Sequence, residues 1–264
     1  MARAVRSVGY HLREWRQRRR MSQLDLAFEA DVSSRHVSFV ETGRAQPSRE
    51  MLLHLAERLE VPLRERNTLL IAGGYAPVFP EREISDSAMI AARAAIDLVL
   101  KGHEPYPAFA VDRHWTMVAS NSAIGILMGG VSEALLQPPV NVLRLAMHPD
   151  GLASRIANYR QSRSLLIVRL KQQIGATADP YLMNLWEEIN GYPEPPGVLD
   201  ELAGDDTEYA GIVTPLKIRT DDGILSLFST TTVFGTPVDI TLSELAIEAF
   251  FPADARSAEM LRKL

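Results

Sequence analysis

Two short helical segments joined by a turn of a few residues constrain the fold of this chain more than any other feature. The first follows Ser22, whose hydroxyl caps the helix start while Asp25 completes a capping box, and it runs to about residue 30. The second is capped by Ser33 or Ser34 and stops at Gly43. This spacing of two short helices is the geometry that seats the second helix in the major groove of DNA.

Three more helical segments surround this pair. Apolar residues recur every three or four positions over residues 8–19, Ser48 is placed to cap a fourth helix, and Pro62 opens a fifth. Glycines and prolines without sustained periodicity then mark a boundary. The sequence predicts a five-helix α domain, a linker and a second domain, at residues 1–72, 73–87 and 88–264.

The charge of the chain is divided between these parts. Residues 1–72 carry 13 arginines and 9 acidic residues, a net charge of +4, whereas the rest of the chain carries −9. Residues 1–20 hold seven arginines and only one acid, Glu14. This asymmetry indicates a polyanion-binding end. The alternative is a solvated basic helix face that has no partner.

The composition describes a folded protein that suits a reducing compartment. Hydrophobic residues make up 46% and charged residues 23% of the 264 residues, and cysteine is absent. These values exclude a disordered chain, disulfides and a cysteine nucleophile. No stretch approaches the ~20 apolar residues of a membrane span. We expect a cytoplasmic protein without membrane association.

The second domain shows strands as well as helices. Residues 106–111 and 115–120 form one predicted hairpin, and residues 212–219 and 224–234 form another across a turn at 220–223. The region 121–188 is mainly helical, 190–206 is a predicted loop, and 254–264 is a short closing helix. Residues 242–251 fit either a helix or a strand, and we favour a strand. The pattern predicts an α+β domain with an antiparallel sheet.

The segments 21–27 and 32–44 resemble the helix-turn-helix of the lambda-repressor-like (XRE) family, a likeness that covers residues 8–72. On the second helix of the pair, Val37 and Val40 point inward, so the polar face is left for DNA. The resemblance and this face together imply four base-contacting residues: Ser33, Ser34, Arg35 and Phe39. Four others are candidate phosphate contacts: Gln23, Arg44, Gln46 and Arg49.

Each of these assignments has an alternative. Arg35 suits guanine and Phe39 a thymine methyl group, but Phe39 could instead pack against its own chain or a dimer partner. Arg44, Gln46 and Arg49 could simply be solvated. Glu41 would repel DNA if it pointed outward, and the family pattern implies that it pairs with Arg16.

The segments 106–108, 112–115, 145–151 and 228–237 resemble the MmyB-like regulators. That resemblance implies a PAS-like fold around an apolar cavity with a fatty-acid-like or other hydrophobic ligand. The candidate lining residues are apolar: Phe109, Val111, Trp115, Met117, Leu143, Met147, Leu166 and Phe228. Any of them could equally belong to an ordinary core.

Arg163 is the sharpest candidate for a polar ligand contact. It lies within an apolar stripe of a predicted helix, where a buried guanidinium needs a partner, and a ligand carboxylate would serve. The alternatives are that the stripe ends at the domain edge or that Arg163 pairs with a protein acid. His148 is a weaker candidate of the same kind.

These observations indicate a transcription regulator that binds double-stranded DNA, as a homodimer, and senses a small hydrophobic ligand. One alternative is a ligand-free second domain that serves as a dimerisation or protein-interaction platform. The other is an enzyme with a DNA-binding appendage. Nucleophile, metalloprotease, phosphate-loop and dinucleotide motifs are absent, so we expect no catalytic residue, no metal and no required cofactor.

Overall fold

The computed structural model describes residues 6–196 and 214–263, which belong to two compact units. One unit contains residues 1–82 and 237–243, and the other contains residues 83–236 and 244–264. The units therefore divide inside the predicted linker, and a segment from late in the chain joins the N-terminal unit. No helix in the described ranges has the length and apolar character needed to cross a membrane.

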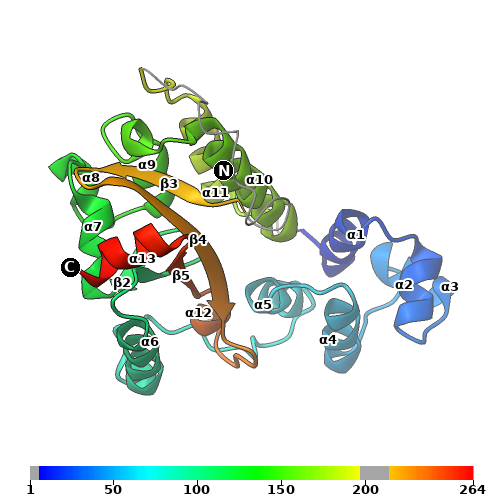
Figure 1. Ribbon diagram of the computed structural model, residues 1–264. Helices are drawn as coiled ribbons and strands as arrows, with labels where there is room; N and C mark the ends of the chain where they lie inside the picture. The colour runs from blue at the N-terminus through cyan, green and yellow to red at the C-terminus, as the bar shows by residue number, and fades with distance from the viewer. Residues whose placement is uncertain (1–5, 197–213, 264) are drawn as a thin grey trace. The chain divides into compact units, whose positions relative to one another are not determined.

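Serine side chains start four of the five N-terminal helices. Ser7, Ser22, Ser33 and Ser48 each accept a hydrogen bond from a backbone amide of the first turn, and Ser22 forms the predicted capping box with Asp25. The helices are α1 (Val8–Arg18), α2 (Gln23–Glu29), α3 (Ser34–Glu41), α4 (Arg49–Arg58) and α5 (Leu63–Ala72). The five predicted helices are confirmed, and Figure 1 shows α2 and α3 side by side.

The late segment of the first unit carries a short helix, α12 (Ile240–Ser243). Ile240 is buried and its amide donates to the carbonyl of Pro80 at 2.9 Å. The side chain of Asp239 is 3% exposed and pairs with Arg82 at 2.9 Å. Residues 237–243 are thus held to the end of the N-terminal segment by a backbone hydrogen bond and an ion pair.

The second unit is an antiparallel five-stranded sheet with helices, the predicted α+β, PAS-like class. The strand order is β2-β1-β5-β4-β3. The strands are β1 (Ala108–Val111), β2 (Met117–Ser120), β3 (Leu216–Thr220), β4 (Gly223–Val233) and β5 (Ala246–Pro252). The long strand β4 crosses the sheet beside β5, and α13 (Ala255–Arg262) lies against both (Figure 1).

Both predicted hairpins are present, as β1–β2 and β3–β4. Gly223 closes the second turn with φ of +123°, a conformation that favours glycine. The ambiguous region 242–251 is divided, because α12 extends to Ser243 and β5 begins at Ala246. The predicted loop at 190–206 and the predicted strand start at 212 lie partly or wholly outside the described residues.

In the sequence, one helix precedes β1, and most of the other helices of this unit lie between β2 and β3. The longest, α10, carries the predicted apolar stripe. The elements are 3₁₀ turns η1 (Ser87–Met89), η2 (Ser122–Ile124) and η3 (Ala153–Arg155), and helices α6 (Ile90–Gly102), α7 (Gly125–Met128), α8 (Glu133–Leu136), α9 (Val142–Met147), α10 (Tyr159–Thr177) and α11 (Pro180–Asn190).

Candidate DNA-reading helix and apolar cavity

Helix α3 presents the face that the sequence assigned to DNA. Val37 and Val40 are fully buried in the core of the first unit, whereas Ser34 and Arg35 are exposed. Ser33 is also exposed, and its hydroxyl accepts from the amide of His36 at 3.1 Å. Inward valines therefore fix the rotation of the helix and leave its polar residues on the outside.

Phe39 lies half-buried between two cations on this face. The guanidinium of Arg35 is 5.1 Å and that of Arg44 is 5.9 Å from the centre of its ring. Such cation–π contacts hold the two arginines near the aromatic side chain. The structure thus brings together three of the predicted DNA-contacting residues.

The other candidate phosphate contacts are distributed around this face. The Gln23 amide donates to Glu41 at 2.8 Å, and the Gln46 amide donates to the carbonyl of Gly73 at 2.8 Å. Arg49 is exposed at the first position of α4. Gln23 and Gln46 are therefore oriented by hydrogen bonds within the protein, while Arg44 and Arg49 are exposed to solvent.

Glu41 does not face outward. Its carboxylate accepts from Arg16 Nε at 2.6 Å and from Arg16 Nη2 at 2.9 Å, as the family resemblance implied. The Glu41 side chain is 2% exposed and that of Arg16 is 10% exposed. The hydrogen bond to Glu41 raises the pKa of Arg16 above its ordinary value. This two-point ion pair connects α1 to the end of α3 and sets the position of α3.

The second unit contains a cavity of about 470 Å³. This volume falls in the range of roughly 300–1,000 Å³ that is typical of small-molecule sites. Five predicted lining residues are at its wall: Phe109, Trp115, Met117, Leu143 and Leu166. Leu165 and Val168 of α10 also line it and are about half exposed, so they lie where the cavity meets solvent.

The remaining predicted ligand residues lie elsewhere. Val111 and Met147 are buried in the core outside the cavity lining, and Phe228 stacks on Phe251 with ring centres 5.3 Å apart. His148 accepts from the amide of Asp150 at 3.1 Å and meets the ring of Tyr192. The fold thus places these four residues against other parts of the protein and not at the cavity wall.

Arg163 does not line the cavity. Its guanidinium lies near Asn190 Oδ1, at 3.3 Å, in a separate polar hollow that includes Tyr159 and Glu194. The cavity face of α10 instead contains Ser162 and Arg169. Since Arg163 follows Ser162 by one residue, it points about 100° away around the helix. Periodicity located an apolar stripe on this helix but not the face that meets the cavity, so it did not show that Arg163 lies outside the cavity lining.

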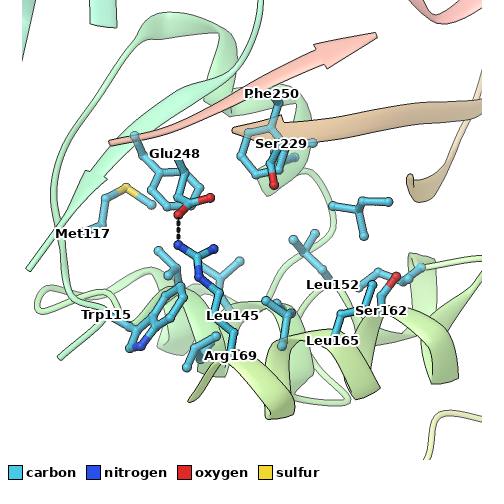
Figure 2. A pocket seen from close by; sticks show the side chains of 18 of the residues that line it. Trp115, Met117, Leu145, Leu152, Ser162, Leu165, Arg169, Ser229, Glu248 and Phe250 are labelled. Atoms are coloured by element: carbon cyan, nitrogen blue, oxygen red, sulfur yellow. Dashed lines mark hydrogen bonds and ion pairs between the residues drawn. The ribbon is translucent and has the colours of Figure 1, made fainter. Parts of the chain in front are cut away.

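The polar group at the cavity is an ion pair that sequence reasoning missed. Arg169 Nη2 donates to Glu248 Oε1 and, at 2.9 Å, to the hydroxyl of Thr231. The Glu248 side chain is 4% exposed. Figure 2 shows this pair at the same end of the cavity as Trp115 and Met117. The available signal was that each residue is a lone charge inside an apolar run, in α10 and in β5.

The side chain of Trp115 contacts Arg169 of this pair and also Gln173, both on α10. The Arg169 guanidinium lies 4.7 Å from its ring centre, and its indole nitrogen donates to Gln173 at 2.7 Å. Its φ of +66° is in the left-handed region, which residues other than glycine rarely adopt. Such a conformation persists only where surrounding contacts hold it, and it is frequent at ligand sites.

Comparison with known proteins places both units in families. Residues 12–66 match the model of a helix-turn-helix, and residues 92–264 match the model of the MmyB-like transcription regulator ligand binding domain. No curated protein matches the chain. A solved structure titled "Structure of an RNA-binding Light-Oxygen-Voltage Receptor" is 14% identical over 99% of this chain, with a TM-score of 0.25. This chain spans 65% of that protein's length, and a TM-score this low does not support any conclusion about the fold.

The helix-turn-helix match covers the pair of helices that the geometry singled out, α2 and α3. The second match covers the whole described sheet and every element that lines the cavity. The chain therefore combines a helix-turn-helix with the ligand binding domain of MmyB-like transcription regulators, and because the second model spans well over half of the chain, the protein belongs to the family of MmyB-like transcription regulators.

Proposed function

We propose that this protein is a sequence-specific transcription regulator that acts in the cytoplasm and whose second unit takes a small hydrophobic effector with a fatty-acid-like apolar chain. The observation that supports an apolar effector is the cavity of about 470 Å³, whose wall consists mainly of aliphatic and aromatic side chains. A second domain that served only as an interaction platform would more readily fill such a volume with its own side chains, because interiors of proteins are close-packed.

The regulator is proposed to act as a homodimer. A single helix of the length of α3, Ser34–Glu41, meets only a few base pairs. Useful specificity therefore requires two half-sites, whose centres lie about 10 base pairs or one DNA turn apart. Sedimentation of the free protein and of its complex with DNA measures this stoichiometry, and a single protomer on the operator would contradict it.

The effector is proposed to act on DNA binding through the connection between β4 and β5. These strands contribute Ser229, Glu248 and Phe250 to the cavity, and the chain between them includes the 237–243 segment of the DNA-binding unit. A change in strand position on effector binding would thus reach the first unit by a second covalent route besides the predicted linker. A ligand shifts this equilibrium only as far as it binds the two states unequally.

The DNA part of the proposal is tested with Arg35→Ala. An operator is first selected from random double-stranded DNA by the wild-type protein. If Arg35 contacts a guanine through two hydrogen bonds, its loss should weaken operator binding by about 1–3 kcal/mol and relax the preference at one base position. Fluorescence anisotropy with the operator and single-base variants measures both effects.

Arg49→Ala is the matched control for that experiment, because Arg49 is exposed at the start of α4 and is assigned to phosphate. Its loss should weaken all DNA sequences alike and lower the salt slope by about 1. Unchanged affinity and base preference in Arg35→Ala would show that α3 is not the reading helix.

The effector part is tested by native mass spectrometry of the purified full chain, followed by denaturing extraction of any bound molecule. We expect a small apolar molecule in stoichiometric amount, released on denaturation. Failure of the protein to bind any medium-chain apolar probe added in excess would favour the platform alternative.

A further inference from the structure

The charged residues at the cavity balance one another. Among the described residues of its lining, only Arg169 and Glu248 carry charge, and they pair directly. The other polar side chains of the lining are neutral: Ser162, Gln172, Thr214 and Ser229. The cavity therefore presents one positive and one negative group with no charge left over.

The hydrogen bonds of the pair leave specific atoms available. Within the described ranges, Arg169 and Thr231 both donate to the same atom, Glu248 Oε1, and both bonds of Arg169 come from Nη2. Glu248 Oε2 is consequently left to accept, and other guanidinium N–H groups are left to donate. In Figure 2 the Glu248 carboxylate lies above the Arg169 guanidinium at the cavity wall, and a dashed line joins the two groups.

We propose that this cavity selects an apolar molecule whose polar head is uncharged, such as a hydroxyl or a carboxamide, over the corresponding carboxylate. The proposal rests on the effector site described above and names the head group that this site takes. A hydroxyl donates to Glu248 Oε2 and accepts from Arg169, so it satisfies the available acceptor of one residue and an available donor of the other. A carboxamide does the same with its NH₂ and its carbonyl oxygen.

A carboxylate fits this end of the cavity poorly for two reasons. It has no proton to donate to Glu248, and it places a second negative charge beside a carboxylate whose side chain is 4% exposed. Like charges disfavour each other strongly where water is excluded, and a single guanidinium balances only one of them. Glu248 thereby acts as the residue that determines head-group specificity.

The test measures the affinities of decanol, decanamide and decanoic acid for the full-length protein by isothermal titration calorimetry at neutral pH. These probes share one apolar chain and differ in the head group. We expect the alcohol and the amide to bind at least tenfold more tightly than the acid. Acid binding as tight as that of the alcohol would overturn the head-group assignment while leaving the effector site in place.

Glu248→Gln separates the role of this charge from the general preference of an apolar site. The variant keeps the shape of the side chain and removes the negative charge, so Arg169 becomes free to pair with a ligand carboxylate. The acid should then gain at least tenfold relative to the alcohol. Arg163→Gln is the matched control, since Arg163 is on the same helix outside the cavity, and its ratio should equal that of the wild type.

The remaining outcomes are also informative. An unchanged acid-to-alcohol ratio in a folded Glu248→Gln protein would overturn the specificity role of Glu248. Binding of none of the three probes to the wild-type protein would overturn the proposed effector site itself. The two failures are thus distinguishable in one series of titrations.

Discussion

Replacing Glu41 with alanine should lower the free energy of unfolding of the DNA-binding unit by about 3–5 kcal/mol, the usual cost of removing one partner of a buried ion pair. The side chain of Arg16 is 10% exposed and would keep only its bond to the carbonyl of Met21, at 2.7 Å. The amide of Gln23 would also lose its acceptor. Urea titration followed by hydrogen-exchange mass spectrometry measures the change separately for peptides of each unit.

Glu14→Ala is the control for this experiment. Glu14 pairs with Arg18 at 2.7 Å on the same helix, but both side chains are roughly one-third exposed. Exposed pairs of this type contribute about 0.3–0.5 kcal/mol. Equal effects of the two substitutions would contradict the structural role assigned to the Arg16–Glu41 pair. The large loss should also appear as weaker DNA binding, since the pair positions α3.

Gly151→Ala is expected to produce the second large effect, in the ligand-binding unit. An alanine Cβ at this position would lie 2.3 Å from the carbonyl oxygen of Leu145, so the backbone must shift. Overpacking of this kind costs about 1–3 kcal/mol. Leu145 and the following Leu152 both line the cavity, so the shift should also weaken binding of apolar probes. Urea denaturation and probe titration measure the two effects.

Gly175→Ala is the matched control, with the opposite expected sign. Gly175 lies within α10, and a Cβ there would meet no atom within 4 Å apart from its chain neighbours and the nearby backbone of its own helix. Alanine should stabilise the helix by about 0.5–1 kcal/mol, because glycine loses more backbone freedom on folding. A destabilisation of equal size in both variants would show that the close approach at Gly151 has no special cost.

Local chemistry explains why the N-terminal unit was predictable from sequence. Four of the five helix starts depend on a serine and the amides of the next turn, and the outward face of α3 follows from the spacing of Val37 and Val40. The pairing of Arg16 with Glu41 came from the family resemblance rather than from spacing. All of these features depend on neighbours within one helix or on a recurrent motif.

In the ligand-binding unit, sequence patterns predicted only part of the secondary structure. The hairpins β1–β2 and β3–β4 were predicted because their turns are local, whereas the division of residues 242–251 between α12 and β5 was not. The reason is tertiary. Ile240 is buried against the first unit's own segment at Pro80, a contact that joins residues far apart in the sequence.

The sequence by itself determined the helices of the N-terminal unit, the strand pairs joined by tight turns and the outward-facing residues of α3. Only the tertiary structure decided that Arg169, and not Arg163, reaches the cavity, and that Glu248 meets it there. Periodicity shows that a helix has distinct faces, but which face borders a cavity depends on how α10 is rotated against the sheet. That rotation is set by the packing of segments distant in sequence, since each side chain gains its burial from all of its neighbours at once.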